Sequence, residues 1–203
     1  MPSIRIEYLK YELIEKNANE FLKRYNPQRK IPVPIENIIE ITLKIKIIPV
    51  PDLRKIHQID GYTSHNRKEI TVDQLDLEKI PNRYRFTLGH EAGHIFLHRD
   101  IFEELTINTI SDWKEFVSSI PEKDYSRLEY QAYCFAGLVL VPKLELSKEI
   151  HTLHNLLIAK NFDIESNKDL VWEIIYEGLA TKFMVSKDVI MKRIQKENLQ
   201  EIF

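Results

Sequence analysis

The chain has 203 residues, of which 43% are hydrophobic and 30% charged, so it suits one globular domain or one domain with a small appendage. Its formal net charge of -2 argues against a surface dominated by binding to nucleic acid or to acidic membranes. No stretch approaches the roughly 18 apolar residues of a membrane span, and the N-terminal residues lack the apolar core of a signal peptide. We therefore expect a cytoplasmic protein that does not associate with membranes.

Helical spacing of apolar residues predicts a helix over about 7–25, and a short second helix is expected over 34–42, with proline in its first turn. Extended segments follow. They are 44–50, 62–64 and 69–72. The polar linker between the last two suits a hairpin, so the sequence predicts a small sheet before the central helix.

The central helix is opened by Pro81 and contains Thr87-Leu-Gly-His90-Glu91-Ala-Gly-His94-Ile-Phe-Leu-His98. Positions i and i+4 lie on one helix face, so His90 and His94 can aim their imidazoles at one point, with Glu91 beside it. Zinc binds neutral imidazoles and, in catalytic sites, three protein ligands plus water; Glu91 is the natural general base for that water. Gly93 costs roughly 1 kcal/mol relative to alanine in a helix. We interpret it as leaving room beside a metal.

A third ligand must come from elsewhere. His98 is excluded, because about 12 Å of helix rise separates it from His90, whereas two nitrogens on one zinc ion lie within about 4 Å. The nearby carboxylates are Asp100, Glu103, Glu104, Glu115 and Glu129. Glu129 is preferred, since the small residues Ala132 and Ala136 would let its helix approach the histidine helix. The alternatives are Glu115 as ligand, or a capping box in which Glu129 serves only the start of a helix at Ser126.

Further helices are expected over 126–140 and 147–159 and from about residue 170, the last turned near 185–186. The order of helices, short sheet and helices predicts an α+β fold, mostly helical, with a three-stranded sheet packed beside the histidine helix.

The histidine motif, followed by Glu129-Tyr-Gln-Ala-Tyr-Cys-Phe-Ala-Gly-Leu-Val-Leu-Val-Pro142, resembles the ImmA/IrrE family of metallo-endopeptidases. Weaker agreement over 31–36 and 179–193 extends the resemblance to about 17–195. It implies that His90, His94 and Glu129 hold zinc (Zn²⁺), that Glu91 activates water, and that the substrate is a helix-turn-helix transcriptional repressor. The family usually has Asn or Asp four residues after the ligand glutamate, where this chain has Tyr133. That departure affects ligand orientation.

The chain resembles a stand-alone member, because its first 30 residues are too few for the DNA-binding domain that many relatives carry. We expect one metallopeptidase domain over 1–203, with 165–203 as a C-terminal helical subregion. Residues 179–194 have a sequence pattern like that of a helix-turn-helix. The alternative function is therefore a regulator that binds a repressor or DNA without cleavage. We do not expect direct DNA binding.

Tyr133, His98 and Tyr84 are the candidates for an oxyanion donor in the proposed site. The only cysteine, Cys134, is expected to be a buried inert thiol.

Overall fold

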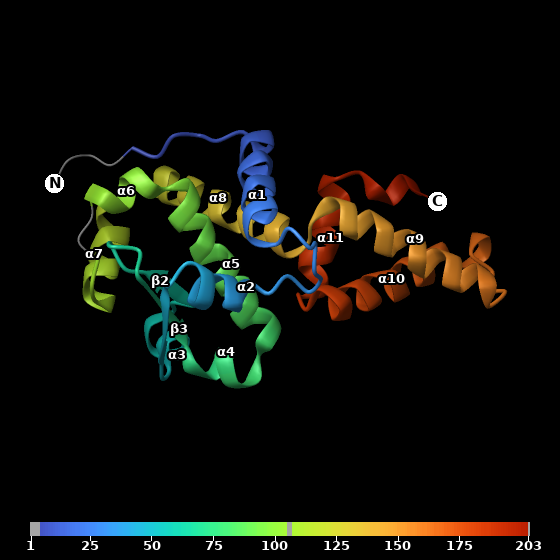
Figure 1. Cartoon of the computed structure of the whole chain (residues 1–203), viewed down its shortest axis with the longest axis horizontal. Coiled ribbons are helices and arrows are strands. Elements are labelled where there is room, and N and C mark those ends of the chain that lie inside the picture. Colours follow the sequence, from blue (N-terminus) through green and yellow to red (C-terminus); the bar gives the residue numbers. More distant parts are fainter. Residues whose placement is uncertain (1–4, 105–106, 203) are drawn as a thin grey trace.

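A computed structural model describes residues 5–104 and 107–202, without the side chains of 103, 104, 201 and 202 (Figure 1). The helices are α1 (Tyr11–Tyr25), α2 (Ile35–Asn37), α3 (Leu53–His57), α4 (Gln74–Lys79), α5 (Pro81–Leu97), α6 (Arg99–Glu104), α7 (Ile110–Ser119), α8 (Glu122–Leu140), α9 (Lys143–Ala159), α10 (Lys168–Phe183) and α11 (Lys187–Lys196). A π-helical turn η1 (Ile38–Thr42) extends α2, and two 3₁₀ turns are η2 (Glu165–Asn167) and η3 (Leu199–Ile202). The strands are β1 (Lys46–Val50), β2 (Gly61–Thr63) and β3 (Glu69–Asp73). The predicted mostly helical α+β class is confirmed.

The sheet has the order β1-β3-β2, with β1 parallel to β3 and β2 antiparallel to it, so the predicted hairpin is confirmed. Its edge strand β2 lies against α5. At Gly61 the approach is so close that a Cβ atom would lie 2.7 Å from Thr87 Cγ2 and 2.9 Å from the carbonyl oxygen of Thr71. Glycine at this position therefore lets the start of β2 lie beside the middle of the histidine helix.

Helices α5 and α8 form the central pair of the fold. A Cβ atom on Gly93 would lie 2.9 Å from Ala132 Cα, and one on Gly89 would lie 3.3 Å from Ala136 Cβ. Small residues on both helices thus allow close packing, as expected for Ala132 and Ala136. Our interpretation of Gly93 was wrong, because the missing side chain makes room for α8 and not for a metal.

Helix α8 begins earlier than the sequence predicts. It starts at Glu122 after Pro121, with Glu122 and Asp124 in its first turn, where acidic side chains complement the helix dipole. Ser126 and Glu129 therefore lie inside the helix. The capping-box alternative for Glu129 is wrong, because a residue in the second turn has no unpaired helix-start amide to accept from.

Four short helices, α3, α4, α6 and α7, were missed by the periodicity argument. Each spans ten residues or fewer, so an amphipathic pattern has little length over which to repeat. Capping marks two of them in the sequence. The Asp73 side chain accepts from the first turn of α4, and Thr109 with Asp112 forms a capping box at α7.

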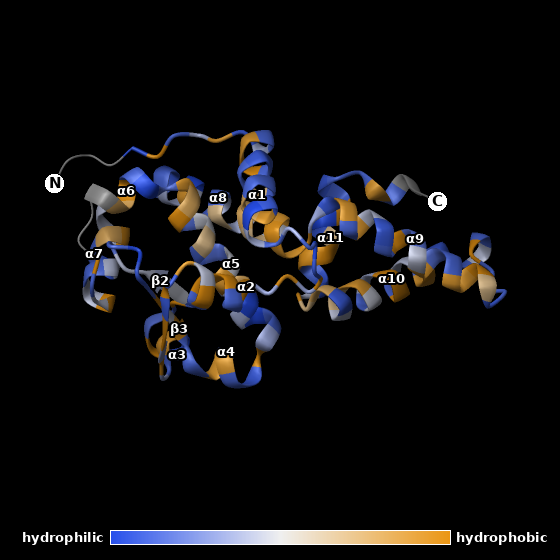
Figure 2. Ribbon diagram, in the orientation of Figure 1, coloured by the Kyte–Doolittle hydropathy of each residue, from blue (hydrophilic) through white to orange (hydrophobic). Residues whose placement is uncertain are grey.

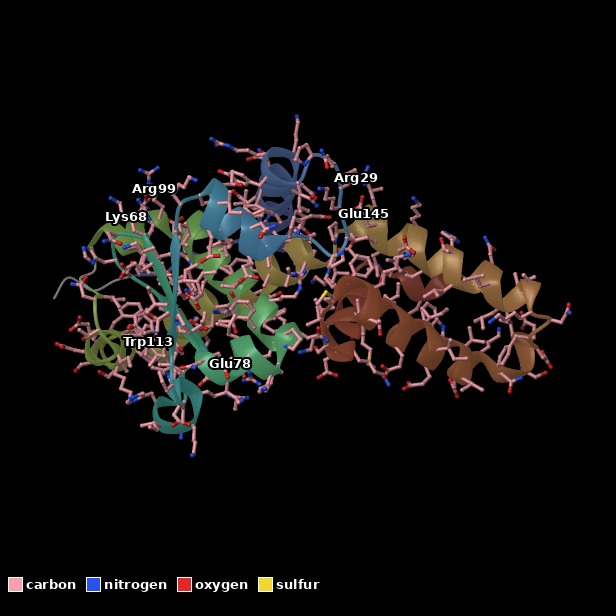
Figure 3. The ribbon with its side chains drawn as sticks, turned by 60° about the horizontal axis from the view of Figure 1, so that its bottom comes forward. Arg29, Lys68, Glu78, Arg99, Trp113 and Glu145 are labelled. Atoms are coloured by element: carbon pink, nitrogen blue, oxygen red, sulfur yellow. The ribbon has the colours of Figure 1, made fainter. Side chains whose placement is uncertain are left out.

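At the C-terminal end, α9 and α10 pack against each other and extend to one side of the molecule, while α11 returns to pack against α8 (Figure 1). Hydrophobic and hydrophilic residues alternate along these helices, as expected for helices with one buried face (Figure 2). An ion pair between Arg29 and Glu145 joins the segment after α1 to α9 (Figure 3). No helix in 5–104 or 107–202 combines the length and apolarity needed to cross a membrane.

Candidate metal centre

Three side chains from two helices converge at the centre of the molecule. His90 and His94 come from consecutive turns of α5, and Glu129 comes from the facing side of α8. The Nε2 atoms of the histidines are 3.0 Å apart. Glu129 Oε2 lies 3.2 Å from His90 Nε2, and Glu129 Oε1 lies 3.5 Å from His94 Nε2. The close packing of α5 on α8 produces this convergence.

These distances fit a metal ion. Ligand atoms about 2.0–2.1 Å from a tetrahedral zinc ion lie roughly 3.3–3.4 Å from one another, close to the separations of the three donor atoms here. Two imidazoles and one carboxylate are also a donor set that zinc accepts in catalytic sites, with a fourth position left open. The three residues could therefore hold such an ion without rearrangement of the backbone.

Glu91 is the other carboxylate beside the histidines, and its ligand atom also lies within 4.8 Å of theirs. Its environment differs from that of Glu129. The Thr63 hydroxyl at the end of β2 donates to Glu91 Oε2 over 2.8 Å, and both side chains are buried. Because Glu91 is oriented by the sheet while Glu129 contacts both imidazoles, the geometry favours Glu129 as the third ligand and leaves Glu91 next to it.

A series of hydrogen bonds orients His94 through its Nδ1 atom, on the side of the ring away from His90 and Glu129. Gln131 Nε2 donates to the carbonyl oxygen of Glu7 over 2.8 Å, so its Oε1 accepts from His98 Nε2, also over 2.8 Å. Burial lowers the pKa of His98 to about 3, so His98 is neutral and its Nδ1 accepts. His94 Nδ1, 3.1 Å away, must then be the donor. This tautomer leaves the lone pair of His94 Nε2 directed at the centre.

His98, which follows the last residue of α5, therefore orients a neighbouring histidine. The sequence did not predict a role for Gln131. Its position two residues after Glu129 places it on a different face of α8, and nothing local in the sequence marks it as a partner of His98. Only the contact between α5 and α8 brings the two together.

Glu129 is ionised in this environment. Burial acts to raise the pKa of its carboxyl group, but the facing imidazoles of His90 and His94 outweigh burial and hold the pKa below its ordinary value. A negative carboxylate facing two imidazoles makes the centre attractive to a divalent cation.

The centre opens into a cleft of about 630 Å³ between α5, α8, the start of α11 and the loop before β2. A smaller chamber of about 40 Å³ lies behind it, floored by apolar side chains that include Phe102 and Phe116. Trp113 of α7 (Figure 3) and Tyr125 of α8 line both spaces. Tyr125, one turn before Glu129, was also missed from the sequence.

Two of the other candidate ligands have exposed side chains. Glu115 and Asp100 are exposed on α7 and α6, and the side chains of Glu103 and Glu104 are outside the described part of the chain. Among the proposed oxyanion donors, Tyr84 is buried and donates to Glu36 over 2.9 Å, and His98 is occupied with His94 and Gln131. The hydroxyl of Tyr84 and the ring nitrogens of His98 therefore already have hydrogen-bond partners within the protein.

Tyr133 does not replace the Asn or Asp of the family pattern. Its ring contacts Phe86, with centroids 5.0 Å apart, and its hydroxyl accepts from Lys192 over 3.1 Å. Among described residues it makes no hydrogen bond to the histidines or to Glu129. Cys134, the next residue, is half-buried rather than fully buried, and burial raises the pKa of its thiol, as expected for an inert cysteine.

Comparisons with known proteins bear on the fold and the family of this chain. No curated protein matched the sequence. Among solved structures, the chain is similar to a Mycobacterium tuberculosis transcriptional regulator, with a TM-score of 0.52 and 13% identity over 92% of this chain and 52% of that one. It spans about half the length of that regulator, and at this identity the likeness concerns the fold alone. The profile of the M78 peptidases, described as the IrrE N-terminal-like domain, matches residues 43–195. This chain therefore belongs to the IrrE N-terminal-like family of M78 peptidases.

Proposed function

We propose that this protein is a zinc-dependent endopeptidase in which His90, His94 and Glu129 bind the metal and Glu91 is the general base. The observation that carries the proposal is the convergence of three donor atoms, 3.0–3.5 Å apart, beside a second buried carboxylate and an open cleft. A purely structural cluster would need neither the cleft nor Glu91. Membership of a peptidase family supports the same reading.

When bound, zinc lowers the pKa of a water molecule and polarises a peptide carbonyl. The protein's own residues then supply the proton transfers. Glu91, fixed by the Thr63 hydroxyl, accepts the proton of the attacking water and returns it to the leaving amine. The relay through His98 and Gln131 keeps His94 in the tautomer that binds the metal.

Tyr125 is the side chain we propose as the oxyanion donor. It lines the cleft and the inner chamber, and its hydroxyl makes no hydrogen bond with any described residue. Burial raises the pKa of the phenol, and the charges of Glu129 and Glu91 raise it further, so it remains protonated and able to donate. A donor that lines the same spaces as His90 and Glu129, and has no other hydrogen-bond partner among the described residues, suits the stabilisation of developing negative charge.

The proposed substrate is a helix-turn-helix transcriptional repressor, whose cleavage would relieve repression. The family resemblance supports this assignment, and the solved structure that shares the fold is named a transcriptional regulator. We further propose that residues 1–203 act as one metallopeptidase domain, with 165–203 as its helical C-terminal part. Contacts of α11 with α8 favour a single unit.

The alternative, a regulator that binds without cleaving, uses the C-terminal helices. Their packing disfavours DNA binding. Arg193 is buried and bonded to Glu197 and to the carbonyl oxygen of Val141, and Lys187 pairs with Glu173. Arg193 and Lys187, two cations of this segment that could otherwise contact phosphates, are therefore engaged within the protein, as in a helix that closes a core.

The direct test uses a repressor encoded beside this protein. The two purified proteins are incubated together, and fragments are identified by mass measurement. We expect discrete fragments with zinc-loaded protein, none after a chelator, and recovery when zinc is restored. Equal fragmentation with and without the chelator would reject a metal-dependent peptidase.

A further inference from the structure

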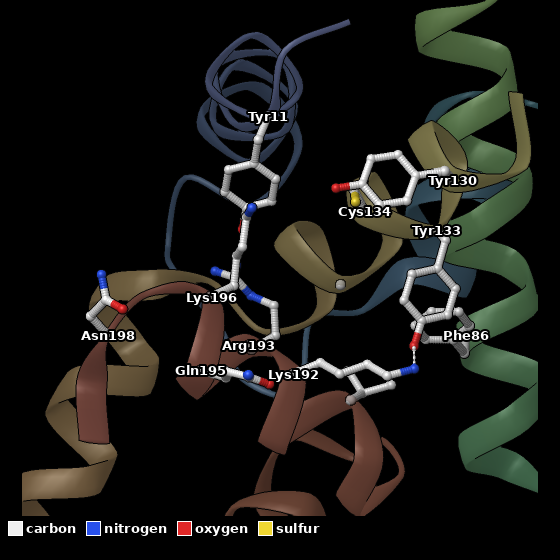
Figure 4. A pocket seen from close by; sticks show the side chains of 12 residues that line it. Tyr11, Phe86, Tyr130, Tyr133, Cys134, Lys192, Arg193, Gln195, Lys196 and Asn198 are labelled. Carbon is white, nitrogen blue, oxygen red and sulfur yellow. Dashed lines mark hydrogen bonds between the residues drawn. The ribbon is translucent and has the colours of Figure 1, made fainter. Parts of the chain in front are cut away.

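A second hollow, of about 520 Å³, adjoins the cleft between α1, α8 and α11 (Figure 4). The rings of Tyr11, Phe86, Tyr130 and Tyr133 line it, and α11 closes its opposite side. We call this hollow the aromatic basin. The ring of Tyr130 is 48% exposed, so the basin is open to solvent at this residue.

The basin is continuous with the cleft that holds the metal centre. Phe86, Tyr133, Val189 and Lys192 line both spaces and form their common rim. In Figure 4 the Lys192 side chain reaches from α11 to the hydroxyl of Tyr133, with Phe86 behind that ring. A substrate peptide that leaves the metal centre along α8 must therefore cross this rim and enter the basin.

The spacing of the lining residues along α5 and α8 gives the direction and length of the path from the metal centre to the basin. Glu129, Tyr133 and Gly137 follow one another at intervals of four on α8, so they share a face, and His90 and Phe86 do the same on α5. Gly137, in the basin wall, lies eight residues from Glu129, or about 12 Å along the axis. An extended peptide advances about 3.3–3.6 Å per residue, so about three or four residues cover that distance.

The charge of the basin is positive. Lys192, Arg193 and Lys196 line it and no carboxylate does. Arg193 is neutralised by Glu197, with Nη1 2.6 Å from Oε1. The two lysines are not: Lys192 lies over the ring of Tyr133 and Lys196 over that of Tyr11, and neither forms an ion pair with any described residue. Asp188, one turn before Lys192, lines the cleft instead.

We propose that the aromatic basin is a substrate subsite that selects an acidic side chain about three or four residues from the scissile bond. Lys192 and Lys196 receive the carboxylate, and the rings pack against its aliphatic stem and the adjacent backbone. This inference rests on the proposed peptidase function and names a specificity of the same site. It accounts for two exposed lysines that lie over aromatic rings in a hollow that shares a rim with the metal cleft.

The test is a cleavage profile. Wild-type protein is incubated with a peptide mixture from digested cellular proteins, and the residues on either side of each cut are tabulated by mass spectrometry. We expect Asp and Glu to be enriched at the third or fourth position on one side of the cut. In the double variant Lys192→Glu/Lys196→Glu that enrichment should vanish and give way to Lys and Arg.

The matched control is Lys148→Glu/Lys160→Glu. Both residues are exposed, on α9 and just after it, and the change in net charge is the same. This control should keep the wild-type profile. A profile without acidic enrichment at these positions, or one that both double variants alter equally, would overturn the subsite while leaving the peptidase intact. Absence of any cleavage by the wild type would instead reject the peptidase function and the subsite with it.

A binding measurement separates specificity from turnover. In the Glu91→Gln background, a fluorescent peptide taken from the most frequent cut is compared with the same peptide carrying Lys at the acidic position. We expect the Lys peptide to bind roughly tenfold more weakly, because its charge is repelled by the two exposed lysines. The preference should reverse when Lys192→Glu/Lys196→Glu is added, because the variant side chains then attract the Lys peptide. Equal affinities for both peptides would contradict the proposal.

Discussion

Gly93 of α5 lies directly against Ala132 of α8, so close that a Cβ atom at 93 would be 2.9 Å from Ala132 Cα and 3.0 Å from its carbonyl oxygen. Backbone atoms of α8 cannot give way as a flexible side chain could. The contact fixes the distance between the helix that carries the two histidines and the helix that carries Glu129.

Gly93→Ala should therefore destabilise the protein, although alanine is the better helix former by about 1 kcal/mol. Overpacking should outweigh that gain and cost about 1–3 kcal/mol of the free energy of unfolding, measured by denaturant titration. Gly178→Ala on α10 is the control, because its Cβ would meet the end of the Leu153 side chain, which can move. A Gly93→Ala protein as stable as Gly178→Ala would mean that the helices are free to separate.

Replacing Glu129, the proposed third ligand, tests the geometry of the centre. Glu129→Ala removes the carboxylate that faces both imidazoles, so metal content after purification should fall sharply. Glu115→Ala is the matched change at an exposed position and should leave metal content unchanged. Metal analysis of both proteins decides between them. Loss of metal only in the Glu115 variant would show that the centre is assembled differently.

The relay behind His94 predicts an effect without loss of a ligand. His98→Phe keeps an aromatic ring but removes the acceptor for His94 Nδ1, so metal affinity should weaken about 10–100-fold. His151→Phe, at an exposed histidine of α9, should have no effect. Competition with a coloured chelator measures both. Unchanged affinity in His98→Phe would mean that the hydrogen bond does not fix the orientation of His94.

Tyr125→Phe isolates the proposed oxyanion donor. The variant should bind metal as the wild type does, while kcat falls about a hundredfold or more with KM little changed, because the hydroxyl acts only on the developing charge. Tyr133→Phe should lower kcat far less, since its hydroxyl is engaged by Lys192. Similar kcat values for wild type and Tyr125→Phe would remove Tyr125 from the reaction.

Much of the centre could be predicted because its chemistry is local. The i, i+4 spacing of His90 and His94 depends only on helix geometry, and the sheet follows from alternation and a hairpin linker. Glu129 could be proposed from the small residues that follow it, and the structure places it at both imidazoles.

The remaining features depend on contacts between distant segments. The role of Gly93 is set by Ala132 on another helix, and the role of His98 by Gln131 and the backbone of Glu7. Tyr125 reaches the centre only because α8 begins at Glu122 and not at Ser126. Helix periodicity alone locates none of these, since it describes one element at a time.

We propose that this protein cuts a polypeptide with Glu91 as the base. Glu91→Gln keeps the size of the side chain and a hydrogen-bonding oxygen for Thr63 but cannot take a proton. Incubated with the neighbouring repressor, the variant should fold, hold zinc and bind the repressor, yet produce fragments orders of magnitude more slowly than the wild type by mass spectrometry. If wild type and Glu91→Gln relieve repression equally well and neither yields a fragment, the protein acts by binding, and the peptidase account is wrong.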